Sequence, residues 1–364
     1  GWAARYPSLS RLTTPAGRTL ATVTRIQAEQ TDPSDPFSLA SLTRTTPEQR
    51  RTWRAVYDAA TRTETSTSPA GRTAATVYDP WLRPVREETP GLAPVQYAYD
   101  DSPEGGGRLI EIIQGEQGDD PSGQGTEARR IAYGYDDNGH LARITDPLGR
   151  VTRITSDALG RPLSATTPDG RTLTLTYDDA GNLLALTPPG RPPHEMDHDA
   201  RGRETRYDPP VVTEATGGID RAYNLDGDPI RTAHDQGPAI TLHYDAGFDP
   251  EQPPSDTNIA DGRLWRIEAP GNAIEITYDA TGKVHSLATA DGETLTFTRD
   301  GPLPLTETAA GTLNATLAFD YDADLNLAAE TLTTEDDSAY PIDYGYDADG
   351  LLIAASAEGR TLTL

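Results

Sequence analysis

The stretch TLTLTYDDAGNLLALTPPG, residues 172–190, contains the features that decide the fold. Leu173, Leu175 and Tyr177 alternate with three threonines, which is the period-two pattern of a strand with one buried face. The letters DDAG follow, and Asp and Gly favour tight turns. A second short strand is predicted from Leu183 to Thr187, before the letters PPG. The stretch therefore predicts one β-hairpin.

The same hairpin pattern recurs along the chain, and thirteen positions, here called slots, carry Tyr-Asp or a degenerate form of it. Most slots are 21 or 22 residues apart, and the repeats are clearest over 57–100 and 135–350. Longer steps predict inserted loops at about 101–128 and 246–262. Tyr-Asp pairs begin at Tyr57, Tyr78, Tyr99, Tyr135, Tyr177, Tyr244, Tyr278, Tyr321 and Tyr346, and degenerate copies begin at Ser156, His198, Tyr223 and Arg299. Between slots a second turn signal recurs, as PAGR (69–72), PLGR (147–150) and PDGR (168–171).

Thirteen hairpins predict an all-β chain of about 26 strands, a ribbon about 125 Å long at the usual strand spacing. Sheets of this size do not stay flat because twist accumulates, so we expect the ribbon to curl. Two arrangements are open: propeller blades of two periods each, or one continuous wall. The unbroken rhythm of turns and strands favours the wall, because blades would impose a period of about 42 residues.

Composition limits the function classes. The chain has 31 Lys and Arg against 57 Asp and Glu, a net charge of −26, which argues against binding to nucleic acid or to anionic membrane surfaces. It contains no cysteine, so disulfides and cysteine-metal sites are excluded. No apolar run approaches 18 residues, so we expect no membrane span.

The repeated phrases resemble those of the RHS/YD-repeat family. YDDNGHL (135–141) and YDDAGNL (177–183) are similar to its YD repeat, and TSPAGR (67–72) and TDPLGR (145–150) are similar to its second phrase. In that family the repeats build a hollow β-shell, also called a cocoon or barrel, that encloses a C-terminal toxin. Such shells occur in polymorphic toxins, in type VI secretion effectors and in the C subunit of insecticidal toxin complexes. Teneurins use a similar barrel in cell adhesion.

The resemblance implies that residues 1–364 are a shell segment that encapsulates and helps to deliver a toxin, without catalysis and without a cofactor. The implied partners are the C-terminal toxin cargo and the remaining shell fragments of the same polypeptide, with secretion-apparatus and immunity proteins beyond them. The protein would be made in the cytoplasm and secreted by a specialised system. Because GRTLTL (359–364) repeats the letters of 170–175, we expect the chain to be a length of a longer repeat. The alternative is an extracellular carbohydrate-binding or adhesion module of the teneurin type.

One stretch matches a metalloprotease motif. HEMDH (194–198) has the H-E-x-x-H letters, in which two histidines on one helix face bind zinc and the glutamate acts as base. The context argues against a helix, because two prolines precede it and His198 occupies a Tyr-Asp slot. We therefore expect a strand here, and no zinc site at His194, Glu195 and His198.

Acidic and aromatic groups offer three further candidates. NLDGD (224–228) and DADG (347–350) faintly resemble calcium loops, but the glutamate of a complete EF-hand is missing. Paired carboxylates, as at Asp136-Asp137 and Asp178-Asp179, recur with the period, which indicates turns rather than a catalytic pair. The slot tyrosines could stack on sugars, yet aromatic residues in strands usually serve packing. We predict no catalytic, cofactor-binding or metal-binding residue.

Overall fold

The computed structural model describes residues 8–32, 34–35, 38–48, 51–103, 105–115, 128–210, 217–235, 237–244 and 262–364. These residues form β-strands and turns and contain no helix, which confirms the all-β prediction. Accordingly, none of them belongs to an apolar helix of membrane-spanning length. The chain divides into two compact units. Unit 1 comprises Gly1–Leu12, Leu20–Leu175 and Pro188–Gly190, and unit 2 comprises Thr13–Thr19, Thr176–Thr187 and Arg191–Leu364.

In unit 1 each strand from β2 to β14 pairs antiparallel with the next strand in the sequence. The strands of this part of the chain are β1 (Ser8–Thr13), β2 (Thr19–Gln30), β3 (Leu39–Glu48), β4 (Arg51–Asp58), β5 (Thr63–Thr67), β6 (Thr73–Tyr78), β7 (Pro84–Glu88), β8 (Val95–Asp100), β9 (Arg108–Gln114), β10 (Arg129–Tyr135), β11 (Leu141–Thr145), β12 (Val151–Ser156), β13 (Pro162–Thr166) and β14 (Thr172–Tyr177).

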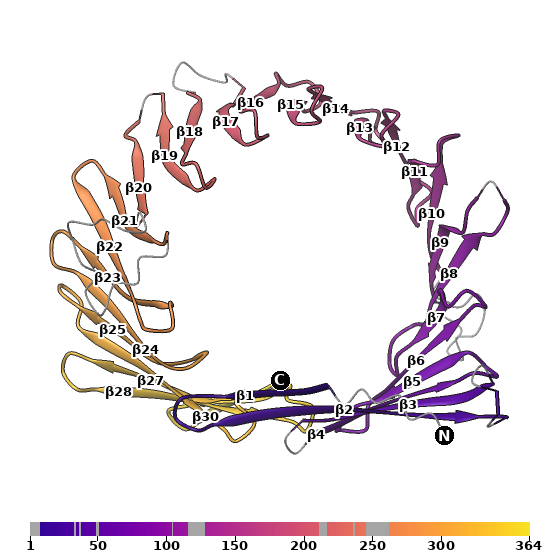
Figure 1. Cartoon of the computed structure of the whole chain (residues 1–364), viewed down its shortest axis with the longest axis horizontal. Helices are drawn as coiled ribbons and strands as arrows, with labels where there is room; N and C mark the ends of the chain where they lie inside the picture. The colour runs from indigo at the N-terminus through magenta and orange to yellow at the C-terminus, as the bar shows by residue number, and fades with distance from the viewer. Residues whose placement is uncertain are drawn as a thin grey trace. The chain divides into compact units, whose positions relative to one another are not determined.

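Unit 2 continues the pattern, and its pairing is unbroken from β15 to β30. Its strands are β15 (Leu183–Thr187), β16 (His194–His198), β17 (Glu204–Asp208), β18 (Ile219–Tyr223), β19 (Pro229–His234), β20 (Ile240–Tyr244), β21 (Leu264–Ala269), β22 (Asn272–Tyr278), β23 (Val284–Thr289), β24 (Thr294–Asp300), β25 (Leu303–Ala310), β26 (Ala315–Tyr321), β27 (Leu327–Thr334), β28 (Ala339–Tyr346), β29 (Leu352–Ala357) and β30 (Arg360–Thr363). Figure 1 labels most of these strands.

The thirteen slots account for the 26 strands from β4 to β29, as predicted. Strands β1 to β3 and β30 are additional, because these segments alternate apolar and polar residues without a Tyr-Asp pair. The predicted loop over about 101–128 is wrong in part. Arg108–Gln114 forms β9, since its run of leucine and isoleucines has high strand propensity and pairs with both β8 and β10. The rest of that loop from residue 116 to 127, and nearly all of the loop predicted over 246–262, lie outside the described residues.

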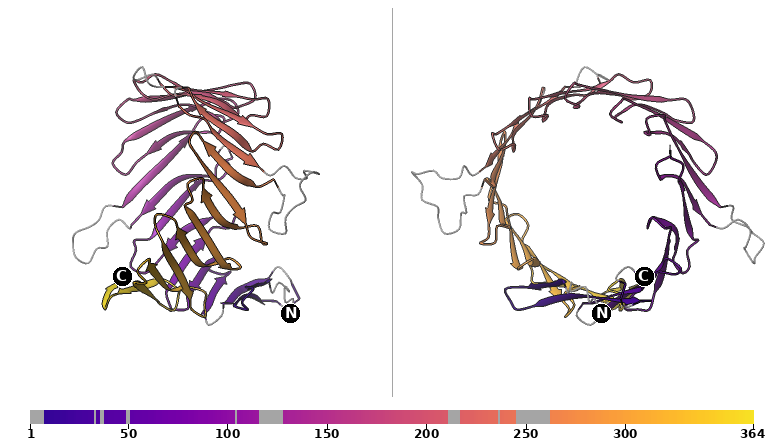
Figure 2. Two further views of the ribbon diagram at one scale, coloured as in Figure 1. Left: turned by 90° about the vertical axis from the view of Figure 1, so that its left-hand side faces the viewer. Right: turned by 45° about the vertical axis from the view of Figure 1, so that its right-hand side comes forward.

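Each unit is a single-layer sheet with two different faces. In β22, the Tyr face carries Ile274, Ile276 and Tyr278, which are half-buried, and the Thr face carries Glu275 and Thr277, which are exposed. Within the described residues, the buried hydrophobic side chains are three alanines, Ala55, Ala233 and Ala273. Among these described residues no large side chain is fully buried, because the strands of each unit form a single layer. Figure 2 shows β20 to β28 of unit 2 as such a layer.

The Thr face is held by pairs of hydroxyls that lie directly opposite each other on neighbouring strands. Thr277 and Ser286 are partners in the ladder between β22 and β23, and their hydroxyl oxygens are 2.7 Å apart. The same arrangement joins Thr155 to Ser164 (2.7 Å), Thr166 to Thr172 (3.0 Å), Thr298 to Thr306 (2.6 Å) and Thr308 to Thr316 (3.2 Å). Each pair contributes about 0.2–1 kcal/mol, so cross-strand contacts stabilise the sheet where a packed core is missing.

A β-bulge lies at nearly every Tyr-Asp slot. In β22 the register shifts between Thr277 and Tyr278, and the same irregularity occurs at the slots from Tyr78 to Tyr346 wherever the pairing is described, with Tyr57 as the exception. Bulges bend a strand and increase its twist. The recurring bulges therefore curve the sheet of each unit, as Figure 1 shows for β18 to β28, and the curvature confirms the curled ribbon.

Candidate functional site

The most regular feature of the molecule is the turn that follows each slot. In the turn from Asp199 to Arg203, Asp199 Oδ1 accepts the backbone N–H groups of Arg201 (2.8 Å) and Arg203 (3.1 Å). Asp199 Oδ2 accepts the Nε–H of Arg203 at 2.8 Å. Gly202, at φ +76°, gives the loop its left-handed residue, which glycine adopts without steric cost. The whole turn is thus closed by donors that lie within four residues of the carboxylate.

Other turns repeat this geometry with the same or a similar residue at the fourth position. Arginine occupies that position in the turns of Asp79, Asp146 and Asp157, where its Nε–H donates to the carboxylate at 2.6 Å. Asparagine replaces it in the turns of Asp178 and Asp322, where the amide donates at 2.8 Å. Asp146 belongs to the second turn signal, so the two signals of the repeat build the same loop.

These contacts set the charge state of the turns. The Arg203 guanidinium, followed by the backbone N–H groups, lowers the pKa of Asp199 to about 2. Asn182 lowers the pKa of Asp178 in the same way. Because hydrogen bonds to the charged form favour ionisation, both carboxylates are charged at neutral pH. Both carboxylates accept hydrogen bonds within their own turns, which does not suit them to act as a catalytic acid or base.

The slot tyrosines connect one turn to the next. Tyr223 donates its hydroxyl to the carbonyl oxygen of Glu204 at 2.7 Å, and Glu204 directly follows the Asp199 turn. The corresponding bonds run from Tyr99 to Pro84 (2.8 Å), Tyr135 to Leu109 (2.7 Å), Tyr278 to Leu264 (2.6 Å) and Tyr346 to Leu327 (2.9 Å). In each case the acceptor is the first or second residue of the preceding strand. The hydroxyl therefore joins two successive hairpins.

The arginine that closes a turn also covers the next slot tyrosine. The Arg203 guanidinium lies 4.7 Å from the ring centroid of Tyr223, and that of Arg83 lies 4.3 Å from Tyr99. Arg203 Nη1 also donates to the carbonyl of Asn224 in the following turn at 3.2 Å. Cation–π contacts of this kind contribute about 0.5–1 kcal/mol at exposed sites. Aspartate, arginine and tyrosine thus form a ladder of turns along one edge of each unit.

A model of the RHS repeat family matches residues 157–192, which contain the turns of Asp157 and Asp178. The chain therefore contains an RHS repeat. No curated protein gives a significant sequence match.

One of the similar solved structures supports the fold of this RHS-repeat chain. A crystal structure of TcdB2-TccC3 without its hypervariable C-terminal region is 12% identical, with a TM-score of 0.50, and the match covers 96% of this chain and 22% of that one. TcdB2-TccC3 is also 12% identical, with a TM-score of 0.49, and the match covers 96% of this chain and 23% of that one. A TccC3 mutant of the Photorhabdus luminescens Tc holotoxin pore is 15% identical, with a TM-score of 0.43, and the match covers 96% of this chain and 22% of that one. The RHS-repeat chain therefore spans less than a quarter of the length of these structures.

HEMDH forms strand β16 of the RHS-repeat chain. Along this strand His194, Met196 and His198 are half-buried, and Glu195 and Asp197 are exposed. Glu195 therefore lies on the face opposite to the two histidines, whereas a zincin helix presents both histidines together with the base. His194 Nδ1 is 2.5 Å from the Tyr207 hydroxyl, and the two rings stack 5.9 Å apart. The strand geometry excludes the helical zinc motif at this position.

The acidic stretches act as turns. Asp347 Oδ1 accepts the backbone N–H groups of Asp349 (2.8 Å) and Leu351 (3.0 Å). In NLDGD the amide of Asn224 donates to Asp228 at 3.0 Å. Asp136 and Asp178 each accept the backbone N–H four residues later, at 2.8 and 2.7 Å. Within the described residues, no group of three or more His, Cys, Asp or Glu side chains is placed to hold a metal ion.

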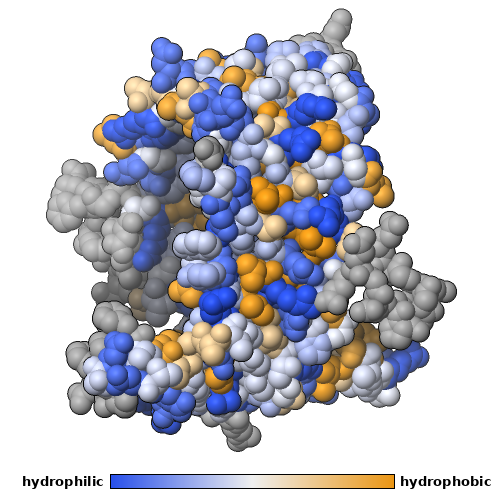
Figure 3. All heavy atoms as spheres, turned by 90° about the vertical axis from the view of Figure 1, so that its right-hand side faces the viewer, coloured by the Kyte–Doolittle hydropathy of each residue, from blue (hydrophilic) through white to orange (hydrophobic). Residues whose placement is uncertain are grey.

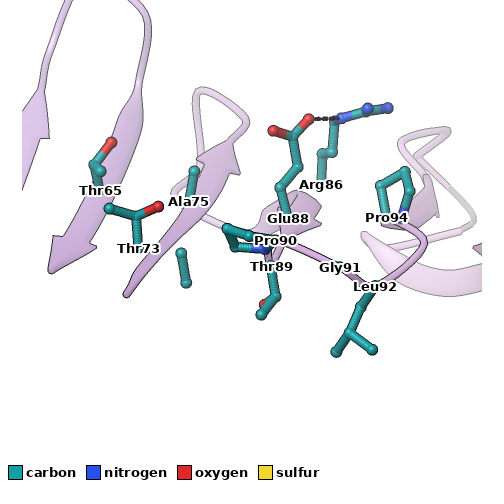
Figure 4. A pocket seen from close by; sticks show the side chains of 11 residues that line it. Thr65, Thr73, Ala75, Arg86, Glu88, Thr89, Pro90, Gly91, Leu92 and Pro94 are labelled. Atoms are coloured by element: carbon teal, nitrogen blue, oxygen red, sulfur yellow. Dashed lines mark hydrogen bonds and ion pairs between the residues drawn. The ribbon is translucent and has the colours of Figure 1, made fainter. Parts of the chain in front are cut away.

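A shallow depression on the surface of unit 1, shown in Figure 4, has a volume of about 430 Å³. It lies over strands β5 to β7 and is bordered by the turn from Thr89 to Pro94. Its polar groups are threonine hydroxyls and the ion pair between Arg86 and Glu88, whose atoms are 2.5 Å apart. On the side of the molecule drawn in Figure 3, apolar and polar side chains are intermixed on the surface. The depression brings together no nucleophile with a base.

The sequence did not reveal the role of the arginines. The letters G-R recur after the turns, as in PLGR and PDGR, and this was the available signal. The pattern shows that arginine is placed regularly, but it does not show that the guanidinium holds the aspartate four positions earlier and covers the next tyrosine. The contact with the next tyrosine needs the hairpins to lie side by side, which is known only from the structure.

Proposed function

We propose that this RHS-repeat chain is a structural wall that helps to enclose and deliver a toxin cargo. The observation that carries the proposal is the single-layer sheet, which leaves both of its faces without a packed core. A curved sheet of this kind separates one volume from another. In the proposal one face borders the cargo and the other faces solvent, and the hollow cocoon is completed by further repeats.

The chain has no catalytic role in this proposal. Its aspartates, tyrosines and arginines are engaged in turns, and HEMDH lies on a strand. The similar structure of TcdB2-TccC3 was determined without a hypervariable C-terminal region, and a variable segment of this kind supports a toxin cargo as the partner. Export by a specialised system, as for type VI effectors, polymorphic toxins and toxin complexes, belongs to the same proposal.

The test uses the absence of cysteine. Leu173 and Thr174 are neighbours on β14 and point to opposite faces, so Leu173→Cys and Thr174→Cys each label one face. In the protein together with its cargo, we expect both variants to react with a small maleimide. The variant on the enclosed face should be protected from a large polyethylene-glycol maleimide. Equal reaction of both variants with the large reagent would show that neither face is enclosed.

The adhesion alternative is less well supported. A sugar needs a free aromatic face to stack on, and the arginines of the preceding turns cover Tyr99 and Tyr223. The hydroxyl groups of both tyrosines are bonded to backbone carbonyls. Binding to a glycan array that is lost in Tyr→Phe or Tyr→Ala variants of these slots would favour adhesion over the wall.

A further inference from the structure

The slot of Arg299-Asp300 departs from the regular turn. Asp300 is followed by Gly301-Pro302-Leu303-Pro304, and β25 begins at Leu303, which pairs directly with Asp300. A regular turn takes its backbone donors from the second and fourth residues after the aspartate. Here both positions are prolines, which have no N–H. The position that normally carries the closing arginine is also Pro304. The Asp300 carboxylate therefore lacks the donors that other turns supply locally.

A second turn supplies these donors. Thr14–Arg18, which belongs to unit 2, has the sequence TPAGR of the second turn signal. The Thr14 hydroxyl donates to Asp300 Oδ2 at 2.6 Å, and the Ala16 N–H donates to Asp300 Oδ1 at 2.7 Å. Arg18 Nη1 lies 3.8 Å from Asp300 Oδ2. The two oxygens thus receive the Ala16 N–H and the Thr14 hydroxyl as donors, while the Arg18 guanidinium lies beyond hydrogen-bond distance and supplies a nearby positive charge.

Arg18 also takes the second role of a closing arginine. Its guanidinium lies 5.7 Å from the ring centroid of Tyr321, the slot that follows Asp300. Arg203 covers Tyr223 and Arg83 covers Tyr99 in the same manner. On the other side, the Nζ of Lys283 donates to the carbonyl of Gly301 at 2.7 Å. The Thr14–Arg18 turn therefore fills one position of the ladder, between the turn that ends at Lys283 and the slot of Tyr321.

Burial marks this contact as unusual. Within the described part of the chain, Thr14 and Asp300 are the buried polar residues, with exposed fractions of 3% and 2%. A buried carboxylate is tolerated only when it is hydrogen-bonded, and its donors here come from 284 and 286 residues away in the sequence. Gly301 fits closely against the turn, since a Cβ at this glycine would lie 3.1 Å from Pro15 Cδ.

We propose that the shortened turn at Asp300 is a binding site for an arginine-bearing Thr-Pro-Ala-Gly-Arg turn, and that residues 14–18 of the same chain occupy it. The bound turn replaces the donors that Pro302 and Pro304 remove. The Asp300 site is then a long-range docking point on which the regular ladder of unit 2 depends. This inference concerns how the wall holds together and does not rest on the enclosure of a cargo.

The first test is a cross-link in the full chain, which has no native cysteine. A Cβ at Gly301 would lie 3.7 Å from the Thr14 Cβ, and disulfides span about 3.5–4.5 Å between these atoms. We expect the Thr14→Cys/Gly301→Cys variant to form an intramolecular disulfide on mild oxidation. The matched control pairs Thr14→Cys with Gly292→Cys, another glycine of positive φ, which has no neighbouring atom within 4 Å. The control should stay reduced or form only intermolecular links. Equal behaviour of the two pairs, or a disulfide solely between copies, would overturn the proposal.

The second test measures energetic coupling by denaturant unfolding of the full chain. Thr14→Val removes the donor without changing the shape, and Asp300→Asn changes the acceptor. Residues in direct contact couple, so the effects of the two substitutions on the unfolding constant should differ from independence by about threefold or more. Thr14→Val combined with Asp199→Asn is the control and should be additive. Additivity in both pairs would show that the turn does not act on Asp300 in solution.

Discussion

The turns at Asp199 and Asp300 each hold an aspartate carboxylate through hydrogen bonds, but the donors come from different parts of the chain. Asp199 takes its donors from Arg201 and Arg203, and its side chain is 24% exposed. Asp300 takes its donors from the distant Thr14–Arg18 turn and is 2% exposed. The loop explains the difference. Four residues, among them Gly202 and Arg203, separate Asp199 from β17, whereas only two residues separate Asp300 from β25.

This comparison separates local from long-range stabilisation within one type of repeat. The Asp199 turn can form as soon as its own residues are in place. The Asp300 contact requires closure of a loop of nearly the whole chain, which is slow and entropically costly. A repeat protein with regular turns is stabilised mainly by nearest neighbours. The shortened turn at Asp300 adds one contact that depends on a distant segment.

Acidification should give the largest effect, because it acts on all the aspartate turns together. The pKa of Asp199 is lowered to about 2 by Arg203 and the backbone N–H groups. Burial acts to raise the pKa of Asp300, but the Thr14 hydroxyl, the Ala16 N–H and Arg18 outweigh it, so that this pKa is lowered too. A lowered pKa gives stability that is present above the unfolded value of about 3.9 and is lost as the pH falls through the folded value.

The measurement is the denaturant midpoint by circular dichroism at a series of pH values. We expect a nearly constant midpoint from about pH 7 to 5 and a steep decline from about pH 4 toward 2. Asp199→Asn should lower the midpoint at neutral pH and make the decline shallower, because one of the titrating groups is gone. An unchanged midpoint down to pH 2.5 would contradict the role of the turn carboxylates.

Gly202→Ala should destabilise the local turn by about 1–3 kcal/mol. Gly202 has φ +76°, and an added Cβ would lie 2.8 Å from Asn182 Oδ1. Asn182 cannot move aside freely, since its amide donates to Asp178. The control is Gly292→Ala, at φ +96° with no atom within 4 Å, which should show the conformational cost alone. Denaturant unfolding measures both variants. Equal losses of stability in the two variants would mean that the added Cβ at Gly202 makes no steric clash with Asn182 of the neighbouring turn.

Much of this architecture could be predicted from the sequence. The alternation in 172–177 and the Tyr-Asp spacing predicted the hairpins, and the slot at His198 placed HEMDH on a strand. Both depend on local pattern, which a single period contains. The loop predicted over about 101–128 failed in part, because the long step from Tyr99 to the next slot was assigned to an insertion although it begins with β9, the return strand of the Tyr99 slot.

The contacts between turns could not be predicted in the same way. The prolines at 302 and 304 show from the sequence that Asp300 lacks local donors, but they do not identify the donors. Thr14, Ser68 and Thr167 each begin a turn of the second kind, with PAGR or PDGR after the first residue. Only the three-dimensional arrangement within unit 2 shows that the turn at Thr14 meets Asp300. Contacts set by packing over long sequence separations leave no periodic signal.

Replacing slot tyrosines by phenylalanine should change the stability less than the substitutions above, and by different amounts at the two kinds of turn. Tyr223 donates its hydroxyl to Glu204, so Tyr223→Phe leaves that carbonyl without its partner and should cost about 1 kcal/mol. Tyr321 contacts Arg18 through its ring, with no hydroxyl bond found within the described residues. Tyr321→Phe should therefore be nearly neutral. Urea midpoints of the two variants provide the comparison, and a larger loss for Tyr321→Phe would contradict it.

A third version of the turn, at Asp79, has the local carboxylate contacts of Asp199 but lacks the glycine. Leu82 occupies the glycine position with φ +61°, and its N–H donates to the Asp79 carbonyl at 3.1 Å. The side chain is 65% exposed, so little packing depends on it. The left-handed conformation costs a residue with a Cβ about 1–2 kcal/mol, whereas the extra flexibility of glycine in the unfolded chain costs about 0.5–1 kcal/mol.

Leu82→Gly should consequently stabilise the chain by about 0.5–1 kcal/mol, the smallest effect in this series. The matched control is Leu92→Gly. Leu92 is also an exposed turn leucine, at 69%, but it is not among the residues with positive φ, so glycine there should destabilise by about 0.5–1 kcal/mol. Opposite signs for two exposed leucines would show that backbone conformation governs the locally closed turns. If both variants lost stability, the carboxylate and arginine contacts alone would hold the Asp79 turn, and the glycine of the repeat would be dispensable.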